Sequence, residues 1–180
     1  MNILLHICCG PCAIYPSREL RKSGHGITGY FFNHNIHPFQ EYQRRLDGAR
    51  QMCETERFEL ICRDESRLEE FLSAVAQNPA DRCLYCYFSR FDAVAAAARE
   101  LGFDAFSSSL LYSRYQNQEH IRAAGERAAE RHGIRFHYED FRQGWQEGIR
   151  VSKEMGLYRQ QYCGCIYSEK DRYLPKGRNV

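Results

Sequence analysis

The N-terminal segment joins a short apolar run to a cysteine-rich turn: Ile3-Leu4-Leu5-His6-Ile7-Cys8-Cys9-Gly10-Pro11-Cys12. An apolar run this short, bounded by glycine and proline, is typical of a buried β-strand. A helix is expected after the turn, with Pro16 in its first turn and Ser23 and Gly24 near its end. The segment therefore predicts a strand, a cysteine loop and a helix in succession.

The same alternation of strand and helix continues along the chain. Strand-forming patterns occur at residues 27–32, 58–62, 105–110 and 134–138. Helical patterns occur at residues 39–56, 68–76, 84–101, 119–131 and 145–155, and the residues after Gly156 are expected to form a tail. This order predicts an α/β three-layer sandwich with a five-stranded, mostly parallel, Rossmann-like sheet. A length of 180 residues suits one domain, expected to span residues 1–180.

Composition narrows the class of protein. Hydrophobic residues make up 43% of the chain and charged residues 27%, which excludes disordered and fibrous classes. No export signal precedes the first strand, and no apolar stretch approaches the roughly 20 residues of a membrane span. We therefore expect a cytoplasmic protein without membrane contact. The net charge of +2 neither requires nor excludes a nucleic-acid partner.

Nine cysteines are unusual in a chain of this length. Without an export signal, they favour metal or redox chemistry over a disulfide framework. Seven of them fall into three groups: Cys8, Cys9 and Cys12; Cys83 and Cys86; Cys163 and Cys165. The other two, Cys53 and Cys62, stand alone, and we interpret them as small buried hydrophobic side chains.

The predicted topology brings the three groups to one edge of the sheet. Ligands of parallel sheets bind at the carboxyl ends of the strands, and the first group directly follows the first strand. The second group begins the helix that leads into the fourth strand, so it lies at the same edge. The third can return there, because the seven residues of 156–162 reach about 23–25 Å when extended, whereas the last helix descends about 16 Å. Since helix N-termini lower thiol pKa values, Cys12, Cys83 and Cys86 are expected to be thiolates at neutral pH.

Seven convergent thiols exceed the four that one tetrahedral zinc ion or one 4Fe–4S cluster uses. The surplus indicates a cluster together with a second, mononuclear metal. Two alternatives stay open. The sequence Cys9-Gly10-Pro11-Cys12 matches the thioredoxin active-site tetrapeptide, which favours a dithiol oxidoreductase, although that reading leaves the other groups without a role. The third hypothesis is a non-catalytic, zinc-binding RNA module.

Polar and aromatic side chains are expected at the same edge. His34 and His37 follow the second strand, where they could donate protons, bind phosphate or cap the next helix. Ser107, Ser108 and Ser109 end the fourth strand, and Tyr112, Arg114, Tyr115, Gln116 and Asn117 follow them. Exposed tyrosines among Tyr85, Tyr87, Tyr112 and Tyr115 could stack a nucleobase. The chain from Arg114 onward contains 13 Lys and Arg residues but only 9 Asp and Glu residues. This excess of positive charge is compatible with an RNA substrate.

Five motifs in a fixed order resemble those of the QueH family of epoxyqueuosine reductases, over residues 4–165. They are His6-x-Cys8-Cys9-Gly10-Pro11-Cys12, Asn35-Ile36-His37-Pro38 with Glu41-Tyr42 and Arg45, Arg82-Cys83-x-x-Cys86-Tyr87, Gly102-Phe103-Asp104-x-Phe106-Ser107-Ser108-Ser109-Leu110, and Gln161-Tyr162-Cys163-Gly164-Cys165. Two departures could alter substrate fit. Arg114 stands where proline is expected, and serines replace threonines after the fourth strand.

The resemblance implies the last step of queuosine biosynthesis, in which the epoxide of epoxyqueuosine at the wobble position of tRNA is reduced to the alkene. It implies a cobalamin-independent enzyme with a 4Fe–4S cluster and a nearby metal, iron or zinc, and an external electron donor such as a ferredoxin or flavodoxin. It also implies a sheet similar to that of nucleotide alpha-hydrolases, with the cysteine loop in place of the phosphate-binding loop.

This chemistry assigns roles to the residues at the predicted site. The expected metal ligands are Cys8, Cys9, Cys12, Cys83, Cys86, Cys163 and Cys165. His37 or Tyr115 is expected to protonate the leaving oxygen. The expected substrate contacts are Asn35, Ser107, Ser108, Ser109 and Gln116.

Overall fold

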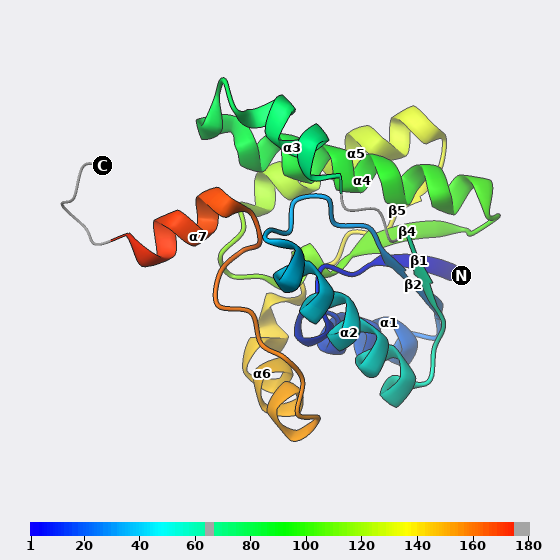
Figure 1. Cartoon of the computed structure of the whole chain (residues 1–180). Helices are drawn as coiled ribbons and strands as arrows, with labels where there is room; N and C mark the ends of the chain where they lie inside the picture. The colour runs from blue at the N-terminus through cyan, green and yellow to red at the C-terminus, as the bar shows by residue number, and fades with distance from the viewer. Residues whose placement is uncertain (64–66, 175–180) are drawn as a thin grey trace.

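The computed structural model describes residues 1–63 and 67–174 (Figure 1). The strands are β1 (Asn2–His6), β2 (Gly26–Phe31), β3 (Leu60–Cys62), β4 (Ala105–Ser108) and β5 (Arg135–Phe136). The α-helices are α1 (Gly10–Lys22), α2 (Phe39–Glu56), α3 (Leu68–Val75), α4 (Arg82–Glu100), α5 (Gln118–His132), α6 (Trp145–Glu154) and α7 (Ile166–Tyr173). Three short 3-10 helices join them: η1 (Pro79–Asp81), η2 (Ser109–Tyr112) and η3 (Phe141–Gly144).

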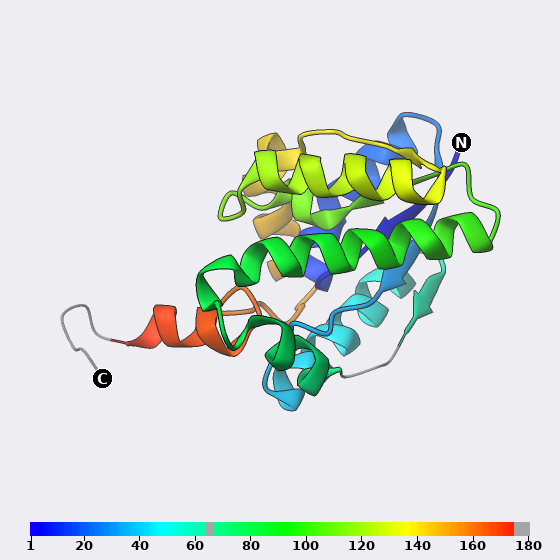
Figure 2. The same ribbon diagram turned by 90° about the horizontal axis from the view of Figure 1, so that it is seen from above.

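The predicted α/β architecture is confirmed. The five strands pair in the order β3-β2-β1-β4-β5, and every pairing is parallel. Helices α1 and α2 cover one face of the sheet, and α4 and α5 cover the other, while α6 packs against α1 (Figures 1 and 2). The central strand β1 is buried on both faces, which explains its continuous apolar sequence. Within the described residues, no helix is both long and apolar enough to cross a bilayer.

The start of α1 differs from the prediction. The helix begins at Gly10, so Pro11 occupies its first turn and Pro16 lies inside it. Cys9 keeps an extended backbone and serves as the N-cap residue. Proline is favoured in the first turn of a helix because the backbone N–H that it lacks would have no intrahelical acceptor there. The helix therefore starts directly at the cysteine turn, and Cys12 belongs to its first turn.

Two further expectations were wrong. The fourth strand ends at Ser108 rather than at residue 110, because the Ser108 side chain accepts a hydrogen bond from the Leu110 amide at 3.1 Å and starts η2. The chain after Gly156 contains a helix, α7, that projects from the body of the molecule (Figure 2). No residue of α7 is buried, so it lacks the apolar periodicity by which a helix is recognised in a sequence.

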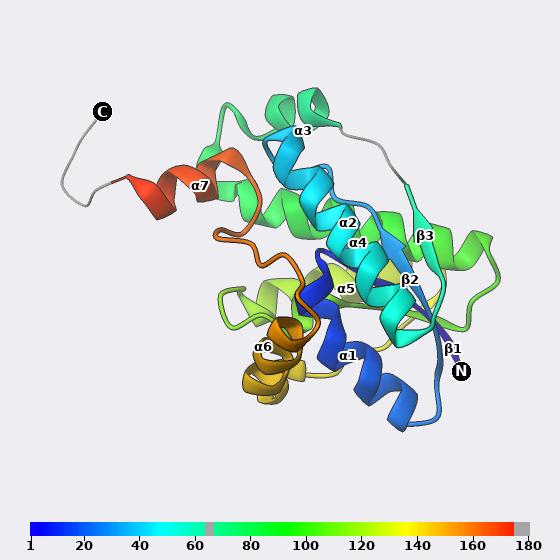
Figure 3. The same ribbon diagram turned by 60° about the horizontal axis from the view of Figure 1, so that its bottom comes forward.

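A close backbone approach fixes the cysteine turn against α2. A Cβ atom at Gly10 would lie 2.3 Å from the carbonyl oxygen of Gly48, well inside van der Waals contact. Helices α1 and α2 lie side by side on the same face (Figure 3). Because glycine at position 10 allows this contact, the first turn of α1 lies directly on α2.

We expect Gly10→Ala to lower the free energy of unfolding by about 1–3 kcal/mol, because the added methyl group must push α1 away from α2. Gly48→Ala is the matched control. A Cβ atom at Gly48 meets no atom within 4 Å, so this change should stabilise the helix by about 0.5–1 kcal/mol. Urea unfolding of the metal-free protein measures both changes. Equal effects of the two variants would contradict the close approach.

Candidate metal centre

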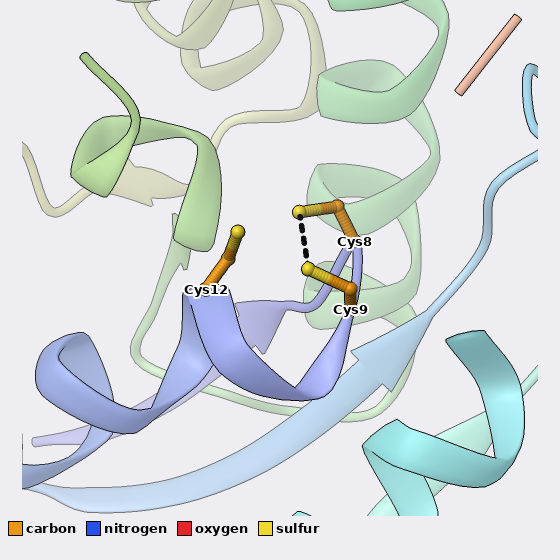
Figure 4. A group of neighbouring side chains, drawn as sticks. All are labelled: Cys8, Cys9 and Cys12. Carbon is orange, nitrogen blue, oxygen red and sulfur yellow. Dashed lines mark hydrogen bonds between the residues drawn. The ribbon is translucent and has the colours of Figure 1, made fainter. Parts of the chain in front are cut away.

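Three thiols form a tight group at the carboxyl end of β1. Cys8 and Cys9 follow the strand, Cys12 projects from the first turn of α1, and the three side chains converge (Figure 4). Their sulfur atoms all lie within 4.8 Å of one another, and the Cys8 and Cys9 sulfurs are 3.8 Å apart. Among the described residues, no other group of three metal-ligating side chains is this compact.

This spacing suits a single metal ion. Thiolates bound tetrahedrally at about 2.3 Å from one zinc ion lie about 3.8 Å apart, which matches the Cys8–Cys9 separation. Three protein ligands leave one tetrahedral position for another molecule, as in catalytic rather than structural sites. The donor set of this group therefore fits a mononuclear, thiophilic metal ion.

The other four clustered thiols form a second group. Cys83 and Cys86 lie in the first turn and a half of α4, and Cys163 and Cys165 precede α7. Burial raises the pKa of Cys86 to about 12, and charges on Cys163, Cys165 and Cys83 add to the effect. Cys86 and Cys165 also share a small apolar cluster with Phe71 and Val75. Cys86 and Cys165 therefore lie in one cluster, while the binding of all four thiols to one metal centre stays a prediction.

A buried arginine connects the two groups. Arg90 is 2% exposed, and its guanidinium donates to the Cys86 sulfur at 3.0 Å and to the Cys86 carbonyl oxygen at 2.9 Å. Its charge also interacts with Cys163 and Cys8, which belong to different groups. A buried cation needs nearby negative charge. Arg90 is therefore placed to compensate thiolates of both groups.

The expectation that helix N-termini make three thiols acidic was wrong. Burial raises the pKa values of Cys83 and Cys86, and the hydrogen bond to Cys8 raises that of Cys12. The low pKa belongs instead to Cys8, whose thiolate is stabilised by hydrogen bonds from Cys12 and Cys9. Burial at Cys83 and Cys86 and the hydrogen bond at Cys12 therefore act against the thiolate form. Metal binding must therefore displace protons from most of these thiols.

A second buried arginine holds the C-terminal segment in place. Arg45 on α2 is 1% exposed and pairs with the Glu41 carboxylate at 2.7 Å. Its two terminal nitrogens donate to the carbonyl oxygens of Cys163 at 2.7 Å and Tyr162 at 2.9 Å. The segment before α7 runs past the N-terminal end of α1 on its way from α6 (Figure 3). Arg45 thus ties the last cysteine pair to the sheet edge.

Two glutamine side chains contact the thiols. The Gln160 amide donates to the sulfurs of Cys9 at 3.0 Å and Cys12 at 3.3 Å. The Gln116 amide donates to the Cys163 sulfur at 3.2 Å, while its oxygen accepts from the Tyr87 hydroxyl. Gln116 was expected at the site, whereas sequence reasoning missed Gln160, Arg90 and the position of Arg45. Arg90 could have been found from its spacing, since it follows Cys86 by one helical turn.

The predicted serines lie in the interior beside the thiols. The Ser109 hydroxyl accepts from the Cys8 amide at 3.1 Å and contacts the Cys8 sulfur at 3.4 Å. The Ser108 hydroxyl meets a ring nitrogen of His6 at 2.9 Å. Ser107 is also fully buried, and its hydroxyl has no hydrogen-bond partner among the described residues. The serines therefore support the cysteine turn, and their contact with substrate stays a prediction.

The loop after β2 contains a concentration of unpaired polar atoms. Asn33, His34, Asn35 and His37 are all buried, and each has one side-chain oxygen or nitrogen without a partner among the described residues. Buried polar groups are normally hydrogen-bonded, so a cluster of exceptions is a feature of functional loops. Burial lowers the pKa of His37, which is therefore neutral at pH 7. Tyr115, the other predicted proton donor, is exposed.

Similarity to known proteins shows the family to which this chain belongs. A sequence profile described as Epoxyqueuosine reductase QueH matches residues 3–171. The chain belongs to the QueH family. A relative named Epoxyqueuosine reductase QueH from Dehalococcoides mccartyi is 37% identical over 96% of this chain and 94% of the relative. A relative of the same name from Thermotoga maritima is 32% identical over 95% of this chain and 92% of its own length.

The fold is shared more widely than the family. A solved structure described as a predicted subunit of a tRNA methyltransferase from Methanocaldococcus jannaschii matches with a TM-score of 0.57. It is 13% identical and covers 86% of this chain and 76% of its own. Likeness at this identity concerns the arrangement of the sheet and helices alone.

We expect Arg45→Met to destabilise the protein by about 3–5 kcal/mol, because it leaves the buried Glu41 carboxylate without its cation. Hydrogen exchange of residues 160–165 should also accelerate, since their anchoring bonds are lost. Arg50→Met, on the exposed side of the same helix, is the matched control and should change stability by less than about 0.5 kcal/mol. Unchanged exchange in a folded Arg45 variant would argue against the anchor.

Proposed function

We propose that this chain reduces the epoxide of epoxyqueuosine in tRNA to the alkene of queuosine, the last step of queuosine biosynthesis. The reaction takes up two electrons and two protons, breaks both carbon–oxygen bonds of the epoxide and releases the oxygen as water. Membership of the QueH family supports this assignment. The observation that carries it is the convergence of the Cys8, Cys9 and Cys12 sulfurs, all within 4.8 Å of one another, at the carboxyl end of β1.

The two thiol groups differ in their number of thiols, which suggests that each binds a different metal centre. Cys8, Cys9 and Cys12 are spaced for one metal ion, iron or zinc, with an open position. Cys83, Cys86, Cys163 and Cys165 supply the four thiolates that a 4Fe–4S cluster requires. When bound, the cluster would supply electrons singly and the metal ion would act as a Lewis acid toward the epoxide oxygen. A ferredoxin or flavodoxin is the proposed electron source, and no cobalamin is involved.

The protein's own residues would bind and protonate the substrate. Nε2 of His37 faces the carbonyl oxygen of His34 at 3.1 Å, so in the neutral ring Nε2 carries the hydrogen and Nδ1 is an unprotonated acceptor. Nδ1 would therefore take up a proton from solvent before passing it to the leaving oxygen. Tyr115 is the alternative proton donor. The proposed substrate contacts are Asn35, Ser107, Ser108, Ser109 and Gln116, and Gln116 is the one among them that reaches a cysteine of the second group.

The geometry disfavours the dithiol alternative. A thiol oxidoreductase needs an accessible cysteine with a lowered pKa. Cys9 and Cys12 are both buried, and their pKa values are raised by desolvation and by hydrogen bonds to Cys8, respectively. A zinc-binding RNA module would use the same thiols without turnover. Metal analysis and an assay for product formation distinguish this hypothesis from the proposed reductase.

We expect anaerobically reconstituted protein to be brown, to contain four or more irons with sulfide, and to convert epoxyqueuosine tRNA under a strong reductant. Cys163→Ala should lose the visible absorbance and the sulfide, because it removes a thiolate of the proposed cluster. Cys9→Ala should keep them while losing the second metal. Both variants should lose turnover, whereas Cys53→Ala should keep it. A colourless wild type with one zinc ion would overturn the proposal.

We expect His37→Gln to lower turnover by roughly 10²- to 10⁴-fold, the usual contribution of general acid–base catalysis. Iron content, visible absorbance and RNA affinity should be unchanged, since glutamine is a polar side chain of similar reach. Tyr115→Phe, which removes a hydroxyl and keeps the ring, tests the alternative donor in the same assay. Full activity of the His37→Gln variant would exclude His37 as the proton donor.

A further inference from the structure

An aromatic and cationic patch lies on the surface beside the metal centre, formed by Arg114, Tyr115 and Trp145. Tyr115 is 85% exposed, more than any other large hydrophobic side chain among the described residues. Its ring meets the Trp145 indole edge-on, with centroids 5.5 Å apart. The Arg114 guanidinium lies over the same indole at 5.9 Å, and no carboxylate pairs with it within the described residues.

The patch rests on a rigid support. The Tyr112 ring stacks on Trp145 with centroids 5.1 Å apart, and its hydroxyl donates to the Trp145 carbonyl oxygen at 2.9 Å. Tyr112 is the last residue of η2, which packs against α1, the helix that contains Cys12. Trp145 and Tyr115 therefore extend outward from an element that packs on the helix of the first thiol group.

The patch also adjoins the second thiol group. Gln116, which donates to the Cys163 sulfur, directly follows Tyr115 in the chain. Cys163 is itself exposed, so the centre opens to solvent on this side. Arg114 and Tyr115 therefore belong to the same loop as the side chain that contacts the exposed thiol of Cys163.

We propose that this patch binds the RNA strand next to the base being modified. Tyr115, supported by Trp145, stacks an unpaired nucleobase that neighbours the modified one, and Arg114 binds an adjacent phosphate. Single-stranded RNA is recognised by bases stacked on aromatic rings and by cations along the backbone, and this patch presents both. The inference rests on the proposed tRNA substrate and adds where its anticodon loop docks.

The test uses the chain's single tryptophan, which lies inside the proposed site. Metal-loaded protein is titrated with a fluorescein-labelled anticodon stem-loop RNA that carries guanosine at the wobble position. Anisotropy gives the affinity, and Trp145 fluorescence should be quenched as RNA binds. Tyr115→Ala should weaken binding roughly 5- to 100-fold, as expected for one lost stacked base, and Tyr115→Phe should bind like wild type. Arg114→Ala should lower the slope of log affinity against log salt by about one.

The matched control is a second cation–aromatic pair on the surface. Arg122 lies over the Tyr138 ring at 5.3 Å, and Tyr138 is 40% exposed, but no contact joins this pair to the cysteines within the described part of the chain. Tyr138→Ala should leave RNA affinity unchanged.

The outcomes separate this inference from the proposed function. Wild-type binding and turnover with no loss in Tyr115→Ala would overturn the stacking role alone, as would an equal loss in Tyr138→Ala. Equal affinity for a fully paired duplex of the same sequence would also overturn it, because a paired base cannot stack on Tyr115. A wild-type protein that neither binds the stem-loop nor converts epoxyqueuosine tRNA would overturn the proposed function itself.

Discussion

The hydrogen bonds of one buried guanidinium join the C-terminal cysteine segment to helix α2 beside the candidate centre. Arg45 donates to two consecutive carbonyl oxygens of the C-terminal segment and pairs with Glu41 behind them. Burying this charge is unfavourable unless its donors are satisfied, so the segment and the helix stabilise each other. The sheet brings the first two cysteine groups to one edge without this contact. The third group has no strand to position it, and contacts from other elements hold it instead, among them the Arg45 hydrogen bonds and the bond from the His37 amide to the Gly164 carbonyl oxygen at 2.8 Å.

A second constraint is charge. Thiolates collected in the interior repel one another, and each also loses its hydration. The protein limits this cost with two buried arginines, Arg90 between the groups and Arg45 beside Cys9 and Cys8. It also keeps most thiols protonated until a metal is bound. The same cations that stabilise the fold would then compensate the negative charge of a loaded centre, so stability and metal binding depend on the same residues.

The parts of the molecule that could be predicted are those set by strand order and chain direction. The parallel sheet and the convergence of the cysteine groups follow from where strands end, which apolar runs and glycines indicate. The pKa values of the thiols could not be predicted from the sequence, because desolvation at Cys86 depends on packing against Phe71 and Val75, which belong to another element. Helix α7 was missed because it buries nothing, and Gln160 because a polar side chain in an irregular segment carries no pattern.

Burial differs among the cysteines in a way that sets the direction of approach. Cys9, Cys12, Cys86 and Cys165 are buried, whereas Cys83 and Cys163 are exposed. The buried thiols can hold a metal away from solvent, but a base of the proposed tRNA substrate can reach the centre only at the exposed thiols. The exposed side of Cys163 lies next to the loop that follows η2, whose outermost residues offer an aromatic ring and a positive charge. In the proposed complex the Tyr115 ring would therefore orient the RNA strand beside Cys163, so that the base to be modified lies next to the thiols.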